Sequence, residues 1–408
     1  MSKTISLKKV AKYSEARIPI KDVTINNFVT TDNLLQNKLG ITKATSLPPQ
    51  DGNMTAYFKN NILVGNIRPY LKKIWFADRD GGNSADVLTI QVDTKHNPKF
   101  IYYALYRDDF FEHMMKGSKG TKMPRGDKTQ IMDFTIPNLD RIKEDKIANI
   151  LSSFDSKIEL NNKINKELEA MAKTLYDYWF VQFDFPNENG KPYKSSGGKM
   201  VYNLELKREI PEGWEVENLA SSTLTSLIIP KIEKFNFEKI YLSTSEVDKT
   251  KIINHEQKIT FKDRPSRANM QPIKNSIWFA RMKNTKKLIL VGEYSNAIVD
   301  NYIFSTGFAG LSIKDYALYY VWNTINNDSF EDIKDTLATG STQKAVTNEA
   351  ISNISLLVPN ENVLNKYTHL LLPFFKKIYT NEQQKQELAK LRDWLLPMLM
   401  NGQVRVEI

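Results

Sequence analysis

The chain has 408 residues, long enough for two or three domains that each bury a core. Lysine and arginine number 57 against 47 acidic residues, and the resulting net charge of +10 suits a polyanionic partner. There is no cysteine, which excludes disulfides, thiol nucleophiles and thiolate metal sites. No segment holds the roughly 20 apolar residues of a membrane helix, so we expect the protein in the cytoplasm.

The first third of the chain is predicted to form a small mixed domain. Strand-like runs at Asn61–Val64 and Val87–Val92 are separated by a turn-rich stretch at Asp78–Asn83, which is typical of an α+β globule. A basic strand–turn segment follows the first run, and a glycine- and lysine-rich loop lies at Gly117–Lys122.

A long helix is predicted next, because no proline or glycine interrupts residues 140–180. Its apolar residues alternate in steps of three and four, a heptad pattern: Ile147, Leu151, Phe154, Ile158, Leu168, Ala172, Leu175 and Trp179. A helix of about 40 residues is roughly 60 Å long and needs a partner along its apolar stripe. The segment Asp184–Lys199, rich in Pro, Gly, Ser and Asn, then indicates a linker.

The second half repeats the first, and its order of features predicts a tandem duplication. The matching pairs are Ile62–Arg68 with Ile277–Met282, Gly117–Lys122 with Gly340–Lys344, Ile131–Asn138 with Ile351–Asn360, and Phe154–Asn161 with Phe374–Asn381. The natural partner of the first long helix is therefore its own duplicate.

The second helix has a seam of its own: Tyr367, Leu371, Phe374, Ile378, Asn381, Lys385, Leu388, Arg392 and Leu395. Pro373 predicts a kink or a restart within it, because proline lacks the backbone donor. Asn161 and Asn381 either meet on the shared seam, where polar residues fix register, or face solvent.

Catalytic patterns are missing from the sequence. The four histidines, His96, His113, His255 and His369, have no metal-ligand spacing, and there is no phosphate-binding GxxxxGK[ST] loop. A nuclease needs only scattered carboxylates, so an enzyme with an unrecognised site stays open as an alternative. A scaffold that binds nucleic acid without reading its sequence is a second alternative.

The residue types that bind duplex DNA recur at equivalent places in both halves. In the first half they are Asn66, Arg68, Lys72, Lys73, Ser118, Lys119, Thr121, Lys122 and Arg125. In the second half they are Arg281, Lys283, Lys286, Lys287, Ser341, Thr342, Gln343 and Lys344. A separate basic stretch of the second half adds Arg264 and Arg267. Different side chains on equivalent loops would let the two halves read different sequences.

Three segments resemble the specificity subunits of Type I restriction-modification systems. Leu168–Pro186 is similar to the exit of that family's central helix, Ile210–Glu215 to the start of its second target-recognition domain, and Leu391–Val404 to its final helix and tail. Near the N-terminus, Arg17–Lys21 lacks the Gly-Trp of Gly213–Trp214, which is a departure from the pattern.

The resemblance implies an α+β fold with two pseudo-repeated target-recognition domains, separated by two long antiparallel helices that form a coiled-coil-like rod. The implied boundaries are residues 1–138 for the first domain, 139–182 for the central helix, 183–210 for a linker, 211–359 for the second domain, and 360–408 for the last helix and tail.

The resemblance also implies a non-catalytic chain that reads a bipartite target in double-stranded DNA. It would position two methyltransferase subunits and the restriction subunits on that target. No cofactor is expected on this chain, while S-adenosylmethionine and ATP/Mg are expected on the partner subunits. Five aromatic residues near the helix ends are candidate partner contacts, with packing between the helices as the alternative: Tyr176, Tyr178, Trp179, Phe180 and Trp394.

Overall fold

The computed structural model describes residues 4–49, 51–253, 256–341 and 343–404. The chain folds as two compact units, one of Met1–Leu160 with Gln384–Ile408 and the other of Asn161–Gln383. Both long helices cross this division, so each unit combines a mixed domain with one segment of each helix.

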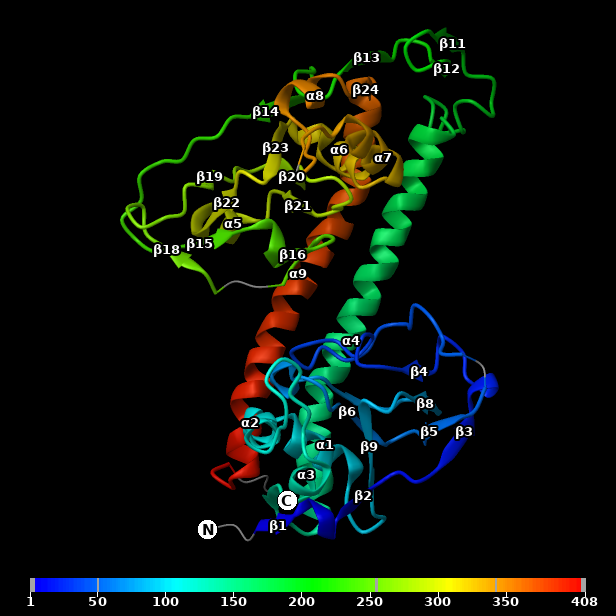
Figure 1. Ribbon diagram of the computed structural model, residues 1–408. Coiled ribbons are helices and arrows are strands. Elements are labelled where there is room, and N and C mark those ends of the chain that lie inside the picture. The colour runs from blue at the N-terminus through cyan, green and yellow to red at the C-terminus, as the bar shows by residue number, and fades with distance from the viewer. Residues whose placement is uncertain (1–3, 50, 254–255, 342, 405–408) are drawn as a thin grey trace. The chain divides into compact units, whose positions relative to one another are not determined.

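The first unit contains two four-stranded sheets (Figure 1, blue to cyan). One is antiparallel, in the order β2 (Ala11–Tyr13), β9 (Val87–Val92), β6 (Ile62–Gly65) and β7 (Ile74–Phe76). The other has the order β3 (Arg17–Pro19), β5 (Asn53–Tyr57), β8 (Gly81–Asn83) and β4 (Phe28–Val29), with β4 parallel to β8. β1 (Thr4–Ser6) pairs with β10 (Thr135–Pro137), and the helices are α1 (Pro98–Tyr106), α2 (Asp108–Lys116) and α3 (Lys128–Met132).

The second unit repeats this arrangement (Figure 1, green to orange). Its antiparallel sheet has the order β14 (Thr225–Ile228), β23 (Phe308–Ile313), β20 (Ser276–Ala280) and β21 (Leu288–Val291). Its other sheet has the order β18 (Lys258–Ile259), β15 (Lys239–Leu242), β22 (Tyr302–Ser305) and β19 (Ala268–Met270), with β15 parallel to β22. β13 (Glu215–Asn218) pairs with β24 (Ser355–Val358), β11 (Met200–Asn203) with β12 (Arg208–Pro211), and β16 (Val247–Asp248) with β17 (Lys251–Ile252). The helices of the domain are α5 (Asn296–Asn301), α6 (Leu318–Ile325), α7 (Asp328–Leu337) and α8 (Asn348–Ser352).

The predicted fold class, two pseudo-repeated α+β domains with two long antiparallel helices, is confirmed. The pairing of β1 with β10 corresponds to that of β13 with β24. The counterpart of the strand after Trp214 is therefore β1, whereas Arg17–Lys21 forms β3 and the turn behind it. This explains why Arg17–Lys21 lacks the Gly-Trp pattern.

The two long helices are α4 (Arg141–Tyr176), which continues into a π-helical turn at Asp177–Val181, and α9 (Glu361–Met400). α9 runs through Pro373 as one helix, so the predicted restart is wrong. Proline removes one backbone hydrogen bond. Packing on both sides of it compensates, since Leu371 is fully buried and Phe375 stacks on Tyr319 with ring centroids 4.4 Å apart.

Polar contacts join the helices within each unit. In the first unit an Arg392 nitrogen lies 2.6 Å from the Asp155 carboxylate. In the second, Asn381 donates to the Asn165 side-chain oxygen at 2.7 Å, and Asn165 donates to Glu382 at 2.8 Å. Asn161 and Asn381 are both buried, so the solvent-facing alternative is wrong for them, although the directly bonded pair is Asn165 with Asn381.

The linker-like segment after α4 is folded. The Phe185 ring stacks on Trp214 at 5.1 Å and on Tyr193 at 4.6 Å between ring centroids. Asp184 accepts hydrogen bonds from the side chain and the backbone of Ser195, which lower the pKa of that carboxyl below its usual value. The segment thus continues the aromatic core at the end of α4.

The buried asparagine pair should contribute measurably to stability. Asn381→Ala leaves the buried Asn165 amide short of one partner, so we expect the free energy of unfolding to fall by about 1–3 kcal/mol in urea titrations. Asn162→Ala, at an exposed position on α4 near Asn165, is the matched control and should change it by less than about 0.5 kcal/mol. Equal effects of the two substitutions would contradict a role for the buried pair.

Candidate nucleic-acid interface

Each domain carries a short hairpin in the same structural position. The backbones of Lys119 and Arg125 exchange two hydrogen bonds of 3.0 Å, and those of Thr339 and Ala345 exchange bonds of 2.9 and 3.1 Å. A glycine with positive φ follows the first residue of each pair, Gly120 at 93° and Gly340 at 129°. The counterpart of Gly340 is therefore Gly120, while Gly117 ends α2 with a φ of −97°.

The backbone of each hairpin is hydrogen-bonded to the basic turn of the same domain. The Arg68 N–H donates to Pro124 O at 2.7 Å, and the Lys283 N–H donates to Lys344 O at 2.9 Å. Two residues further along the chain, Gly126 N–H donates to Asn66 O at 3.1 Å, as Val346 N–H does to Arg281 O at 2.9 Å. The structure thus brings turn and loop together in both domains, by the same backbone contacts.

The last two lysines of each turn bind protein acceptors. The Lys72 ammonium lies 3.0 Å from Asp108, and that of Lys286 lies 2.6 Å from Asp328; these carboxylates are the first residues of α2 and α7. The next lysine in each domain donates to a threonine carbonyl, Lys73 to Thr31 and Lys287 to Thr244. These four lysines, predicted as DNA contacts, serve in the structure as anchors of the turns.

The pKa values of the anchor groups agree with this geometry. The hydrogen bond from Lys286 lowers the pKa of the Asp328 carboxyl below its usual value. Partial burial lowers the pKa of the Lys73 ammonium.

Arg281 has a structural role as well. Its guanidinium donates to Phe308 O and Val346 O, each at 3.2 Å, and to the Asn348 side chain at 2.7 Å. Burial lowers the pKa of this guanidinium. Its counterpart Asn66 is 3% exposed, and its side-chain oxygen has no hydrogen-bond partner among the described residues.

The exposed candidates gather on the hairpins and, in the second domain, on the first half of the basic turn. In the first domain they are Lys119, Thr121, Lys122 and Arg125, and in the second Lys283, Ser341, Gln343 and Lys344. Arg125 forms an ion pair with Asp86. Ser118 caps α2 by donating to Met115 O at 2.8 Å. Thr342 lies outside the described residues.

The remaining arginine candidates differ from each other. Arg267 is exposed, and its carbonyl accepts a hydrogen bond from Thr306 N–H at 2.9 Å. The next residue, Gly307, accepts from Arg281 N–H, so Arg267 lies close to the basic turn. Arg264 instead lies over the Phe261 ring at 4.3 Å.

Met123 was not among the predicted contacts, yet it is 53% exposed and occupies the hairpin position of Gln343. Aligning Gly120, rather than Gly117, with Gly340 in the sequence would have paired Met123 with Gln343.

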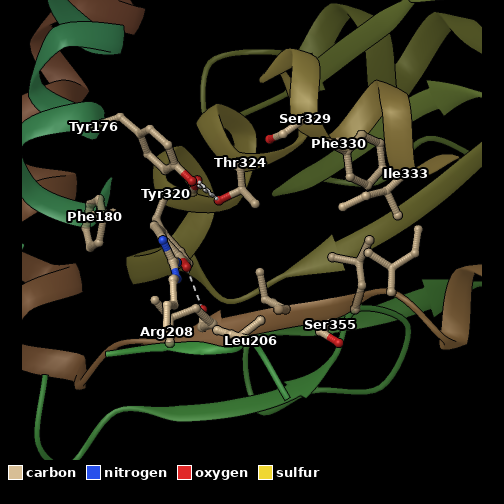
Figure 2. Close-up of a pocket in the computed structure, with 14 residues that line it drawn as sticks. Tyr176, Phe180, Leu206, Arg208, Tyr320, Thr324, Ser329, Phe330, Ile333 and Ser355 are labelled. Atoms are coloured by element: carbon tan, nitrogen blue, oxygen red, sulfur yellow. Dashed lines mark hydrogen bonds between the residues drawn. The ribbon is translucent and has the colours of Figure 1, made fainter. Parts of the chain in front are cut away.

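Three of the five aromatic candidates for partner contacts are buried in the second unit. Tyr176, Trp179 and Phe180 belong to its core, while Tyr178 and Trp394 are exposed. The alternative, packing between the helices, describes Trp179 and Phe180, whose rings lie 5.3 and 4.8 Å from that of Tyr367 on α9. Figure 2 shows the Tyr176 ring pointing toward Thr324 at the edge of a cavity of about 190 Å³, with a hydroxyl–hydroxyl distance of 3.2 Å. Phe330 and Ile333 of α7 line this cavity too.

Across the described ranges, no group of three or more His, Cys, Asp or Glu side chains is arranged to hold a metal ion; His255 lies outside them. Likewise, none of the helices in the described part of the chain is long and apolar enough to cross a membrane.

Comparison with known proteins finds relatives of one kind. The model of the Type I restriction modification DNA specificity domain matches residues 2–170. The Type I restriction enzyme MjaIX specificity subunit of Methanocaldococcus jannaschii is 27% identical over 324 residues, covering 76% of this chain and 69% of that protein. The HindI specificity subunit of Haemophilus influenzae is 24% identical and covers 92% of this chain and 94% of its own length. The chain is similar to Type I restriction enzyme specificity subunits over most of its length.

A solved structure of the same kind shares the fold. The crystal structure of the Type I restriction-modification S subunit from M. genitalium has a TM-score of 0.58 at 15% identity, over 98% of this chain and 96% of that one. The repeated hairpins and basic turns are the candidate DNA interface of this chain.

The recognition hairpin of the second domain should require glycine at position 340. At its φ of 129° a Cβ would lie 2.7 Å from Gln343 O, so Gly340→Ala must distort the hairpin. We expect a loss of about 1–3 kcal/mol in unfolding free energy, measured by urea denaturation. Gly190→Ala, at a φ of 72° with open space around the Cβ, carries the backbone cost alone and should lose about 1 kcal/mol. A smaller loss for Gly340→Ala than for Gly190→Ala would refute the requirement.

Proposed function

We propose that this chain reads a bipartite target in double-stranded DNA, one half-site for each domain, and performs no catalysis itself. The observation that carries the proposal is that two hairpins of the same backbone geometry present different exposed side chains. The first presents Thr121, Lys122 and Met123, and the second presents Ser341 and Gln343. Equivalent positions with different chemistry are what two different half-sites would need.

The exposed side chains have the chemistry of groove recognition. A glutamine such as Gln343 can bond an adenine edge through two hydrogen bonds, and a methionine such as Met123 can contact a thymine methyl group. Lysines bind phosphates and fix the register of the protein on the duplex. Lys119, Lys283 and Lys344 are exposed. Lys119 and Lys344 flank the hairpin tips, and Lys283 lies on the turn that supports the second hairpin.

The same proposal includes the partners of the chain. The paired helices α4 and α9 would dock two methyltransferase subunits, which would carry S-adenosylmethionine and flip the target adenine out of the duplex. Restriction subunits would supply the ATP/Mg-dependent steps. Tyr178 and Trp394, both exposed on or next to the helices, stay predicted partner contacts. The helix length would set the number of unread base pairs between the half-sites.

The two alternatives find less support. A scaffold that binds any duplex has no use for hairpins that differ at their tips. A nuclease would need free carboxylates, but those beside the hairpins and turns bind cations: Asp86 pairs with Arg125, Asp108 with Lys72, and Asp328 with Lys286.

The test of base reading is a pair of substitutions on the second hairpin. Gln343→Ala should weaken binding to one half-site by about 1–3 kcal/mol and relax the base preference there, with the other half-site unchanged. Lys344→Ala, its exposed neighbour, should weaken binding equally for all sequences and reduce the salt dependence by about one phosphate contact. Fluorescence anisotropy of the chain with its methyltransferase partner measures both. Equal losses on every duplex for Gln343→Ala would favour the scaffold.

The spacing role is tested by removing one heptad from each helix. Deleting Ser156–Asn162 together with Gln384–Lys390 keeps the Asp155–Arg392 and Asn165–Asn381 contacts and shortens both helices by about 10 Å. The preferred spacer should then shorten by about three base pairs, as measured by selection from duplexes with varied spacers. Assembly with an unchanged spacer would disprove the spacing role.

A further inference from the structure

A fully buried lysine lies beneath the basic turn of the second domain. Lys334, on α7, is 0% exposed and follows the buried Phe330 by one helical turn. Its ammonium donates to Met282 O at 2.9 Å, to Thr285 O at 3.2 Å and to Glu331 at 2.6 Å. A charge in the interior is costly unless it is paired and hydrogen-bonded, and this one is.

These contacts hold the turn between β20 and β21 against α7. The two carbonyls belong to the residues on either side of Lys283 and Asn284, so a single ammonium closes the turn. Asp335, which lies 3.4 Å from the Lys334 ammonium, accepts the Asn284 N–H through both carboxylate oxygens at 3.0 Å. The turn therefore depends on two neighbouring residues of α7.

This turn also supports the hairpin of the second domain. The N–H of Lys283 donates to Lys344 O at 2.9 Å, and Lys344 follows the exposed Gln343 directly. We propose that Lys334 is the positioning residue for base reading by the second domain, a proposal that rests on the function proposed above. It touches no DNA itself and acts by holding the support of the hairpin.

The first domain holds its equivalent turn differently. Asp108 and Asp328 begin α2 and α7 and pair with equivalent lysines, so Phe111 and Met114 occupy the positions of Glu331 and Lys334. Phe111 is 1% and Met114 0% exposed. The first turn contains a 3-10 turn at Pro69–Leu71. The ammonium of Lys38 also pairs with the Asp108 carboxylate, at 2.6 Å, beside that of Lys72.

This difference supplies the test. The double substitution Glu331→Phe with Lys334→Met grafts the apolar pair of the first domain into the second. Replacing a buried ion pair by apolar residues of suitable size is often neutral for stability, whereas Lys334→Met alone would strand the Glu331 carboxylate. The graft removes the donor to Met282 O and Thr285 O, so the hairpin support is lost while the core stays filled.

The measurement is binding of the chain, assembled with its methyltransferase partner, to duplexes altered in one half-site at a time. We expect the double variant to keep a melting temperature near that of the wild type. Its selectivity for the half-site assigned to the second domain by Gln343→Ala should fall roughly tenfold, and the other half-site should be unaffected. Asp335→Ala removes the tie to Asn284 and the weaker ion pair with Lys334 but keeps the bonds from Lys334 to the turn, so it should shift the same quantity in the same direction by less.

Unchanged selectivity at the second half-site in both variants would overturn the positioning role. Equal losses at both half-sites would overturn it too, because they would reflect general destabilisation. A wild-type complex without any half-site selectivity is a different result, which would refute the proposed function itself.

Discussion

Neither long helix can bury its apolar stripe alone, and the rest of the structure depends on how each unit meets this constraint. In the second unit Tyr367 and Leu371 of α9 are fully buried together with Ala172 of α4 and the aromatic residues that follow it. In the first unit Leu151 of α4 and Leu399 of α9 enter the same core as the domain helices α1 and α2. Each recognition domain thus shares one hydrophobic core with its helix segments, and it cannot move independently of them without exposing that core.

The lysines and arginines of the chain have two roles, which the net charge alone cannot distinguish. Lys72, Lys286 and their neighbours Lys73 and Lys287 bind carboxylates and carbonyls of their own domain, and they hold the basic turns in place. The cations left for a polyanion are those on the hairpins and, in the second domain, on the first half of the basic turn. A domain that reads bases needs such rigid support, because a displacement of about 1 Å misaligns hydrogen bonds to base edges.

The duplication, the two helices and the seam residues could be predicted from sequence, because periodicity and repetition are local signals. The lysine anchors could not, since their acceptors, Thr31 and Thr244, lie more than 40 residues away along the chain. Lys334 left a weaker signal, a lysine on the apolar face of an amphipathic helix. Pro373 misled the prediction because tertiary packing outweighed one missing backbone hydrogen bond.

The most direct test of the central claim, that this chain supplies the sequence specificity of a modification complex, is a methylation map. The chain would be co-expressed with its methyltransferase partner in a host lacking other adenine methylation, and the host DNA read by single-molecule sequencing. The account predicts one bipartite methylated motif that disappears when this chain is omitted. Methylation that persists without the chain, or a motif with a single continuous half, would contradict it.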